Sequence, residues 1–117
     1  MKHHESKLQA QCVKWFRYQY PNHVLFSVPN GGLRSYKTAI RMKQEGALAG
    51  VPDLFLAEST HSHAGLFIEM KVGTAKPTDK QEKMHEQLRV GGYRVEVCRS
   101  FDEFVKLVED YFQDQKP

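Results

Sequence analysis

The amino-acid sequence predicts an α/β fold, in which a mixed β-sheet is flanked by α-helices. Three features support this prediction: helical and strand-like stretches alternate, two central strands share a short polar connection, and two later helices begin with capping boxes. The predicted order is α-β-α-β-β-α-β-α. With 117 residues, 40% hydrophobic and 26% charged, the chain can bury a core and is expected to form one domain over residues 1–117.

The first half of the chain predicts two helices around a short strand. Residues 5–20 carry apolar side chains at helical spacing and stop at a Pro-Asn pair. Residues 24–28 form a short β-rich run that ends at a Pro-Asn-Gly-Gly loop. Residues 36–44 can form a second helix, which closes near Gly46.

The middle of the chain predicts a hairpin and a capped helix. Residues 53–57 and 66–72 read as strands, and the polar stretch between them predicts that they pair antiparallel. Thr78 and Gln81 form a capping box, and a Gly-Gly pair follows the last helical residue, so residues 78–90 are expected to be helical.

A strand and an amphipathic helix are predicted at the end of the chain. Residues 93–98 alternate as a strand does, and Ser100 with Glu103 forms a second capping box. The helix that follows has one apolar face, made of Phe101, Phe104, Leu107, Val108 and Tyr111.

The net charge of +3 is distributed unevenly along the chain. From Phe101 onward, two lysines stand against five Asp or Glu, a balance of −3, so the first hundred residues carry +6. A basic body with an acidic terminal helix favours an anionic partner, with nucleic acid first among the candidates.

The composition also bears on location. No apolar stretch approaches the roughly 20 residues that span a bilayer, and the opening MKHHESK lacks the apolar region of a signal peptide. Cys12 and Cys98 lie in apolar surroundings without CxxC spacing, as reduced core thiols of cytosolic proteins do. We therefore expect a cytoplasmic protein.

The two central strands carry charges in apolar surroundings. Burying a charge costs several kcal/mol unless it is paired or bound. Strand alternation puts Glu69 and Lys71 on one face, and Asp53 can lie near Glu69 if the strands pair. Two carboxylates in a partly buried cleft repel one another unless a divalent cation lies between them, and oxygen ligands suit Mg²⁺ or Mn²⁺. The adjacent lysine can orient a water or stabilise charge on a phosphate.

The alternative is that Asp53 belongs to a turn and that Glu69 and Lys71 form a solvated sheet face. An isolated Glu-x-Lys favours that alternative. The combination of an Asp before one strand, Glu-x-Lys in the next, and a capped helix carrying Gln81 favours the metal site.

The stretches GVPDL and IEMK, followed by Gln81 at a helix start, resemble the PD-(D/E)XK nuclease superfamily and, within it, the VRR-NUC family. Two upstream features extend the resemblance: Glu5 in the first helix, and the Pro-Asn-Gly-Gly loop followed by Arg34. The resemblance covers residues 5–97 and is greatest with stand-alone phage and bacterial members. It implies a restriction-endonuclease-like fold.

The resemblance also implies a Mg²⁺- or Mn²⁺-dependent DNA endonuclease, similar to Holliday junction resolvases. The metal ligands would be Glu5, Asp53, Glu69 and the backbone carbonyl of Met70. Lys71 would position the attacking water with support from Gln81, and cleavage would leave a 5′-phosphate and a 3′-hydroxyl. A four-way junction is cut symmetrically by two related sites, whereas one domain offers one site, so we expect a homodimer.

The DNA contacts are predicted from a Gly-rich loop and the cations that follow it. Such a loop lets a phosphate backbone approach closely, although it could also be a plain turn among solvated lysines. The predicted contacts are Asn30, Gly31, Gly32, Arg34, Lys37, Arg41, Lys76 and Lys80.

Several alternatives stay open at this point. Glu5 can be a surface residue at a helix start, and Gln81 has a sufficient role as a capping partner. His61 and His63 are better explained by a polar loop than by a zinc site. The enzyme could instead nick flaps or duplex DNA, or the fold could serve as a non-catalytic DNA-binding module. The dimer interface could involve the terminal helix or residues 36–42.

Overall fold

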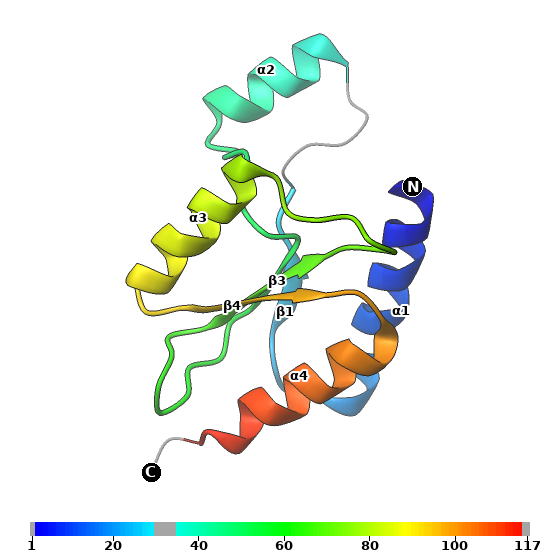
Figure 1. Ribbon diagram of the computed structural model, residues 1–117, viewed down its shortest axis with the longest axis vertical. Coiled ribbons are helices and arrows are strands. Elements are labelled where there is room, and N and C mark those ends of the chain that lie inside the picture. Colours follow the sequence, from blue (N-terminus) through cyan, green and yellow to red (C-terminus); the bar gives the residue numbers. More distant parts are fainter. Residues whose placement is uncertain (1, 30–34, 116–117) are drawn as a thin grey trace.

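The computed structural model describes residues 2–29 and 35–115 (Figure 1). Its elements follow the order that the sequence predicts. They are α1 (Lys2–Gln19), β1 (Leu25–Ser27), α2 (Tyr36–Gln44), β2 (Leu54–Leu56), β3 (Leu66–Met70), α3 (Asp79–Val90), β4 (Arg94–Cys98) and α4 (Phe101–Gln113).

The four strands form one mixed sheet in the order β1-β2-β3-β4. β1 pairs antiparallel with β2, and β2 pairs antiparallel with β3, so the predicted hairpin is confirmed. β3 and β4 run parallel, which requires a crossover between them, and α3 supplies it.

Helices cover both faces of the sheet (Figure 1). α1 and α4 lie on one face and contact each other, while α3 lies on the other face against β4. The core between the sheet and the α1–α4 layer is apolar, as strand alternation predicts. Its fully buried members include Cys12, Phe16, Leu54, Leu56, Leu66, Ile68, Met70, Phe104, Val108 and Tyr111.

The two cysteines belong to this core, as the sequence predicts. Both thiols are free and buried. Burial raises the pKa of Cys12 to about 11 and that of Cys98 to about 12, so both thiols are protonated and poorly nucleophilic at neutral pH.

The two predicted capping boxes form to different extents. At α3, Thr78 accepts from the Gln81 backbone N–H and Gln81 accepts from the Thr78 backbone N–H, so the box is complete. At α4, Ser100 accepts from the Glu103 backbone N–H, but the Glu103 carboxylate accepts from the backbone N–H of Arg99 at 2.8 Å. The second box is therefore only half made, because Glu103 satisfies a donor one residue before the cap.

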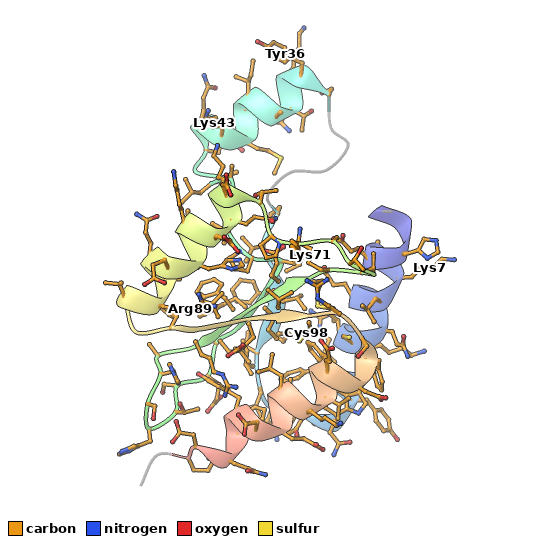
Figure 2. All side chains as sticks on the ribbon, in the orientation of Figure 1. Lys7, Tyr36, Lys43, Lys71, Arg89 and Cys98 are labelled. Carbon is orange, nitrogen blue, oxygen red and sulfur yellow. The ribbon has the colours of Figure 1, made fainter. Side chains whose placement is uncertain are left out.

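α2 differs from the other helices because it has no buried residue. Tyr36 and Lys43 mark its two ends, away from the sheet (Figure 2). Tyr36 is 81% exposed and Ile40 is 41% exposed. The apolar face of α4, in contrast, is used in the core, so the two segments considered for a dimer interface have different surroundings.

Within the part of the chain that the structure describes, none of the helices combines the length and the apolar character needed to cross a bilayer.

Candidate active site

The pairing of β2 and β3 brings two carboxylates together. Leu54 lies opposite Ile68, so the next pair along the ladder is Asp53 and Glu69. Asp53 Oδ2 accepts a hydrogen bond from the Met70 backbone N–H at 2.7 Å. Glu69 is only 2% exposed, on the sheet face that α3 covers. The predicted proximity of the two carboxylates is therefore present in the structure.

The charge of Glu69 is strongly disfavoured in these surroundings. Burial, followed by the charge of Asp53 and a hydrogen bond with it, raises the pKa of Glu69 to about 9. The negative charge of Glu5 adds to this effect, while the positive charge of Lys71 opposes it. The carboxylate pair consequently holds a proton at neutral pH unless a cation replaces that proton.

Lys71 extends β3 beyond its last residue. Its backbone N–H donates to the Cys98 carbonyl at 3.0 Å, which continues the parallel ladder. The side chain is half-buried, and Figure 2 shows it between α3 and α1. Its effect on the pKa of Glu69 means that the ammonium group lies within electrostatic range of the carboxylate pair.

Gln81 caps α3 and also contacts the carboxylate pair. Its Oε1 accepts from the Thr78 backbone N–H at 2.9 Å, which completes the capping box. Its Nε2 donates to Glu69 Oε2 at 3.4 Å. One amide thus caps α3 and touches the carboxylate pair, because its oxygen and nitrogen point to different partners.

His85 is a site residue that sequence reasoning missed. Its side chain is 3% exposed, and its Nε2 lies 3.2 Å from Glu69 Oε1. The signal was its position four residues after Gln81, which puts both side chains on one face of a helix. From the sequence, only the capping residues at the start of this helix were considered, so His85 was not included among the site residues.

Glu5 affects the candidate site electrostatically. It is partly exposed on α1, and no hydrogen bond joins it to the carboxylate pair, although it raises the pKa of Glu69. It also lines a cavity of about 400 Å³ between α1 and β1. The other residues of this cavity are Ser6, Gln9, Ala10, Val13, Arg17 and Ser27.

Gly50 has a steric role next to the site. Its φ of +92° favours glycine, and a Cβ there would lie 3.0 Å from the Lys80 carbonyl oxygen. The segment before β2 therefore approaches the first turn of α3 closely. This contact places the chain leading to Asp53 beside the helix that carries Gln81.

The predicted DNA contacts fall into two groups. Lys37 and Arg41 are exposed on α2, while Lys76 and Lys80 are exposed at and just before the start of α3. The predicted contacts Asn30, Gly31, Gly32 and Arg34 lie outside the described residues.

The donor atoms at the carboxylate pair fit a hard divalent cation. Among residues 2–29 and 35–115, no three His, Cys, Asp or Glu side chains come close enough together to hold a metal ion by themselves. In an extended strand the N–H and C=O of one residue point to the same side, so the Met70 carbonyl faces the Asp53 side. Two carboxylates, one carbonyl and water form a ligand set of the kind that Mg²⁺ accepts.

Comparisons with known proteins show the family and the fold of the chain. The model of the VRR-NUC domain family matches residues 1–102. A solved structure described as a VRR_NUC domain protein superposes with a TM-score of 0.78 and 23% identity, covering 96% of this chain and 90% of that chain. At this identity the superposition shows the fold alone, and no curated protein matches the chain. The chain belongs to the VRR-NUC family and carries a nuclease-type domain.

Proposed function

We propose that this protein is a divalent-metal-dependent endodeoxyribonuclease, which hydrolyses phosphodiester bonds at the Asp53–Glu69 pair. The observation that carries the proposal is the burial of Glu69 beside a second carboxylate, with its pKa raised to about 9. A buried pair of like charges is costly to keep unless a ligand of opposite charge stabilises it. Membership of a nuclease family agrees with this reading.

Asp53, Glu69 and the Met70 carbonyl would hold Mg²⁺ or Mn²⁺, and Glu5 would complete the site from α1, directly or through water. The Asp53 carboxylate is already oriented by the Met70 N–H, so less motion is needed on binding. When bound, the ion would neutralise charge on the scissile phosphate and lower the pKa of a nearby water.

Lys71 would act at the same phosphate. Its ammonium group can position the attacking water and stabilise the charge that develops on the phosphate oxygens. Its place directly after β3, two residues from Glu69, provides the proximity that this role requires. Gln81 would support the arrangement through its hydrogen bond to Glu69.

The DNA backbone would be held by cations that stay in solvent. Lys37 and Arg41 on α2, with Lys76 and Lys80 near the start of α3, are exposed and free of ion pairs among the described residues. Exposed lysines and arginines suit a polyanion because binding releases its counterions. The loop residues Asn30, Gly31, Gly32 and Arg34 would add to this surface.

We further propose that the enzyme acts as a homodimer on branched DNA, with four-way junctions favoured. One chain supplies one carboxylate pair, and symmetrical cutting needs two. The exposed apolar residues Tyr36 and Ile40 of α2 suit contact with a second copy, because the apolar face of α4 is buried in the core. We also propose that residues 1–117 form one domain, because α1 and α4, from opposite ends of the chain, pack on each other. We propose the cytoplasm as the place where the protein acts.

The test uses labelled four-way junction, 5′-flap and plain duplex DNA, each incubated with Mn²⁺ or Mg²⁺. Wild type is compared with Asp53→Ala and with Glu86→Gln, which changes an exposed carboxylate on α3 as a matched control. We expect paired nicks in the junction with wild type and Glu86→Gln, and none with Asp53→Ala.

The other outcomes are informative in different ways. Cutting of flap or duplex as well as junction indicates a broader structure-selective nuclease. Bound but uncut DNA with every protein overturns the catalytic assignment and leaves a DNA-binding module. Cutting by Asp53→Ala at the wild-type rate would place the active site elsewhere.

A further inference from the structure

We propose that His85, together with Gln81, positions both carboxylate oxygens of Glu69 for metal binding. We call these two side chains the α3 clamp. The inference rests on the proposed function, and it assigns His85 a positioning role rather than a direct part in the reaction.

The geometry of the clamp is specific. His85 Nε2 lies 3.2 Å from Glu69 Oε1, and Gln81 Nε2 lies 3.4 Å from Glu69 Oε2. Two residues one helical turn apart thus contact the two oxygens of a single carboxylate. Each carboxylate oxygen has two lone pairs, so one contact from the helix leaves the oxygen able to bind a cation.

His85 is an unexpected residue at a buried position. With 3% exposure, it is the only buried residue of α3 among those described, although apolar residues are more often fully buried than histidine. A buried imidazole without a hydrogen bond is costly, and Glu69 supplies the partner. A leucine or methionine could not make this hydrogen bond, so the bond is what distinguishes histidine here.

The chemistry of the two groups determines which way the hydrogen bond runs. When Glu69 is a carboxylate it can only accept, so the proton must lie on Nε2 and His85 must donate.

The clamp is attached to a well-anchored helix. A complete capping box holds the start of α3, and Arg89 Nη2 donates to the Val95 carbonyl of β4 at 2.9 Å near its end. Figure 2 shows Arg89 at this end of the helix, beside β4. Residues that hydrogen-bond a metal ligand commonly change metal affinity by about 10- to 100-fold when they are removed.

The test measures Mn²⁺ affinity by titration calorimetry, in parallel with thermal unfolding in the presence of a chelator. His85→Phe keeps a ring but removes the N–H donor, while His85→Gln keeps a donor at a similar distance. Leu88→Ala is the matched control, because it truncates a half-buried apolar side chain of α3 and leaves both hydrogen bonds from α3 to Glu69 in place. Should His85→Phe fail to fold, His85→Met replaces it as a variant without a donor.

We expect the variant without a donor to bind Mn²⁺ about 10-fold more weakly or worse, and His85→Gln to recover most of the affinity. Leu88→Ala should lower the Tm in chelator and leave the Mn²⁺ affinity unchanged. Equal affinity of wild type and the donor-free variant overturns the clamp, as does a loss in His85→Gln as large as that in His85→Phe. If wild type itself binds no Mn²⁺, the proposed function fails instead.

Discussion

α2 and α3 are both short polar helices with several basic residues, yet their surroundings are opposite. α3 buries His85 and directs Gln81 towards a carboxylate, whereas α2 buries nothing. The difference follows from topology. β3 and β4 are parallel, so the helix between them must run back along a face of the sheet. α2 instead links two antiparallel neighbours, and it can extend away from the sheet into solvent.

This difference separates two uses of charge in the molecule. At the α3 face, a few charges are desolvated and oriented, which strengthens each interaction and suits chemistry. On α2 the cations remain in water, which weakens each contact but keeps them accessible to a phosphate backbone. Substitutions on the two helices should therefore affect different measured quantities.

The largest effect is expected at Lys71. On the proposed mechanism, Lys71→Met should lower the single-turnover cleavage rate by about 100- to 1,000-fold, because it removes the positive charge that we propose acts at the phosphate. Mn²⁺ affinity should not fall, because the proposed ligand set does not include Lys71 and a positive charge opposes cation binding. Single-turnover cleavage and Mn²⁺ calorimetry on the same preparation measure the two quantities. A parallel loss of metal affinity would show that the substitution had damaged the carboxylate pair.

A smaller effect should appear in the stability of the metal-free protein. Glu69 has a pKa of about 9 in the folded chain, against 4.5 as its ordinary value. The folded state therefore holds a proton that the unfolded state releases. The contribution of Glu69 to stability is fully present below about pH 4.5 and is lost as the pH rises towards 9. In chelator, the Tm of wild type should fall across this range.

Glu69→Gln tests that expectation, because the amide cannot ionise. Its Tm in chelator should depend less on pH, and at pH 8 to 9 it should exceed that of wild type by about 4 °C or more, equivalent to about 1 kcal/mol. Glu86→Gln, on the exposed face of α3, should follow wild type. Parallel pH profiles of wild type and Glu69→Gln would contradict the raised pKa of the carboxylate pair.

The smallest effect is expected on α2. Replacing Lys37 and Arg41 together by alanine should weaken DNA binding several-fold at moderate salt, and should reduce the slope of log K against log[salt] by about 1 for each lost phosphate contact. Mn²⁺ affinity and Tm should hardly change, because neither side chain is buried. Fluorescence anisotropy over a salt series gives the slope, and an unchanged slope would remove α2 from the DNA surface.

Local patterns predicted the elements closely. The bounds of α2 agree with the expected residues 36–44, and the capping box at Thr78 forms completely. These predictions succeed because a cap or a helical stripe depends on residues three or four apart. The motif of Ser100 and Glu103 was predicted less well. The Glu103 carboxylate accepts from the backbone N–H of Arg99, a residue outside the motif, instead of from that of Ser100.

Local patterns also predicted part of the candidate site. Asp53 and Glu69 were expected together because a short polar connection implies a hairpin, and a hairpin pairs its two strands. His85 lies one helical turn after Gln81, but its contact with a carboxylate sixteen residues earlier depends on how α3 packs on the sheet, so the spacing alone did not identify it. The contact of Gln81 with Glu69 likewise depends on where α3 lies against the sheet.

The sequence by itself determined the order of elements, the capped helices and the residue types able to hold a hard cation, because these depend on local spacing and on side-chain chemistry. Only the tertiary structure decided the strand order, the parallel pairing of β3 with β4, the burial of Glu69 and its contact with His85. Those properties arise when segments distant in sequence exclude water together. The free energy of a buried charge is then determined by its neighbours in space rather than by its neighbours in sequence.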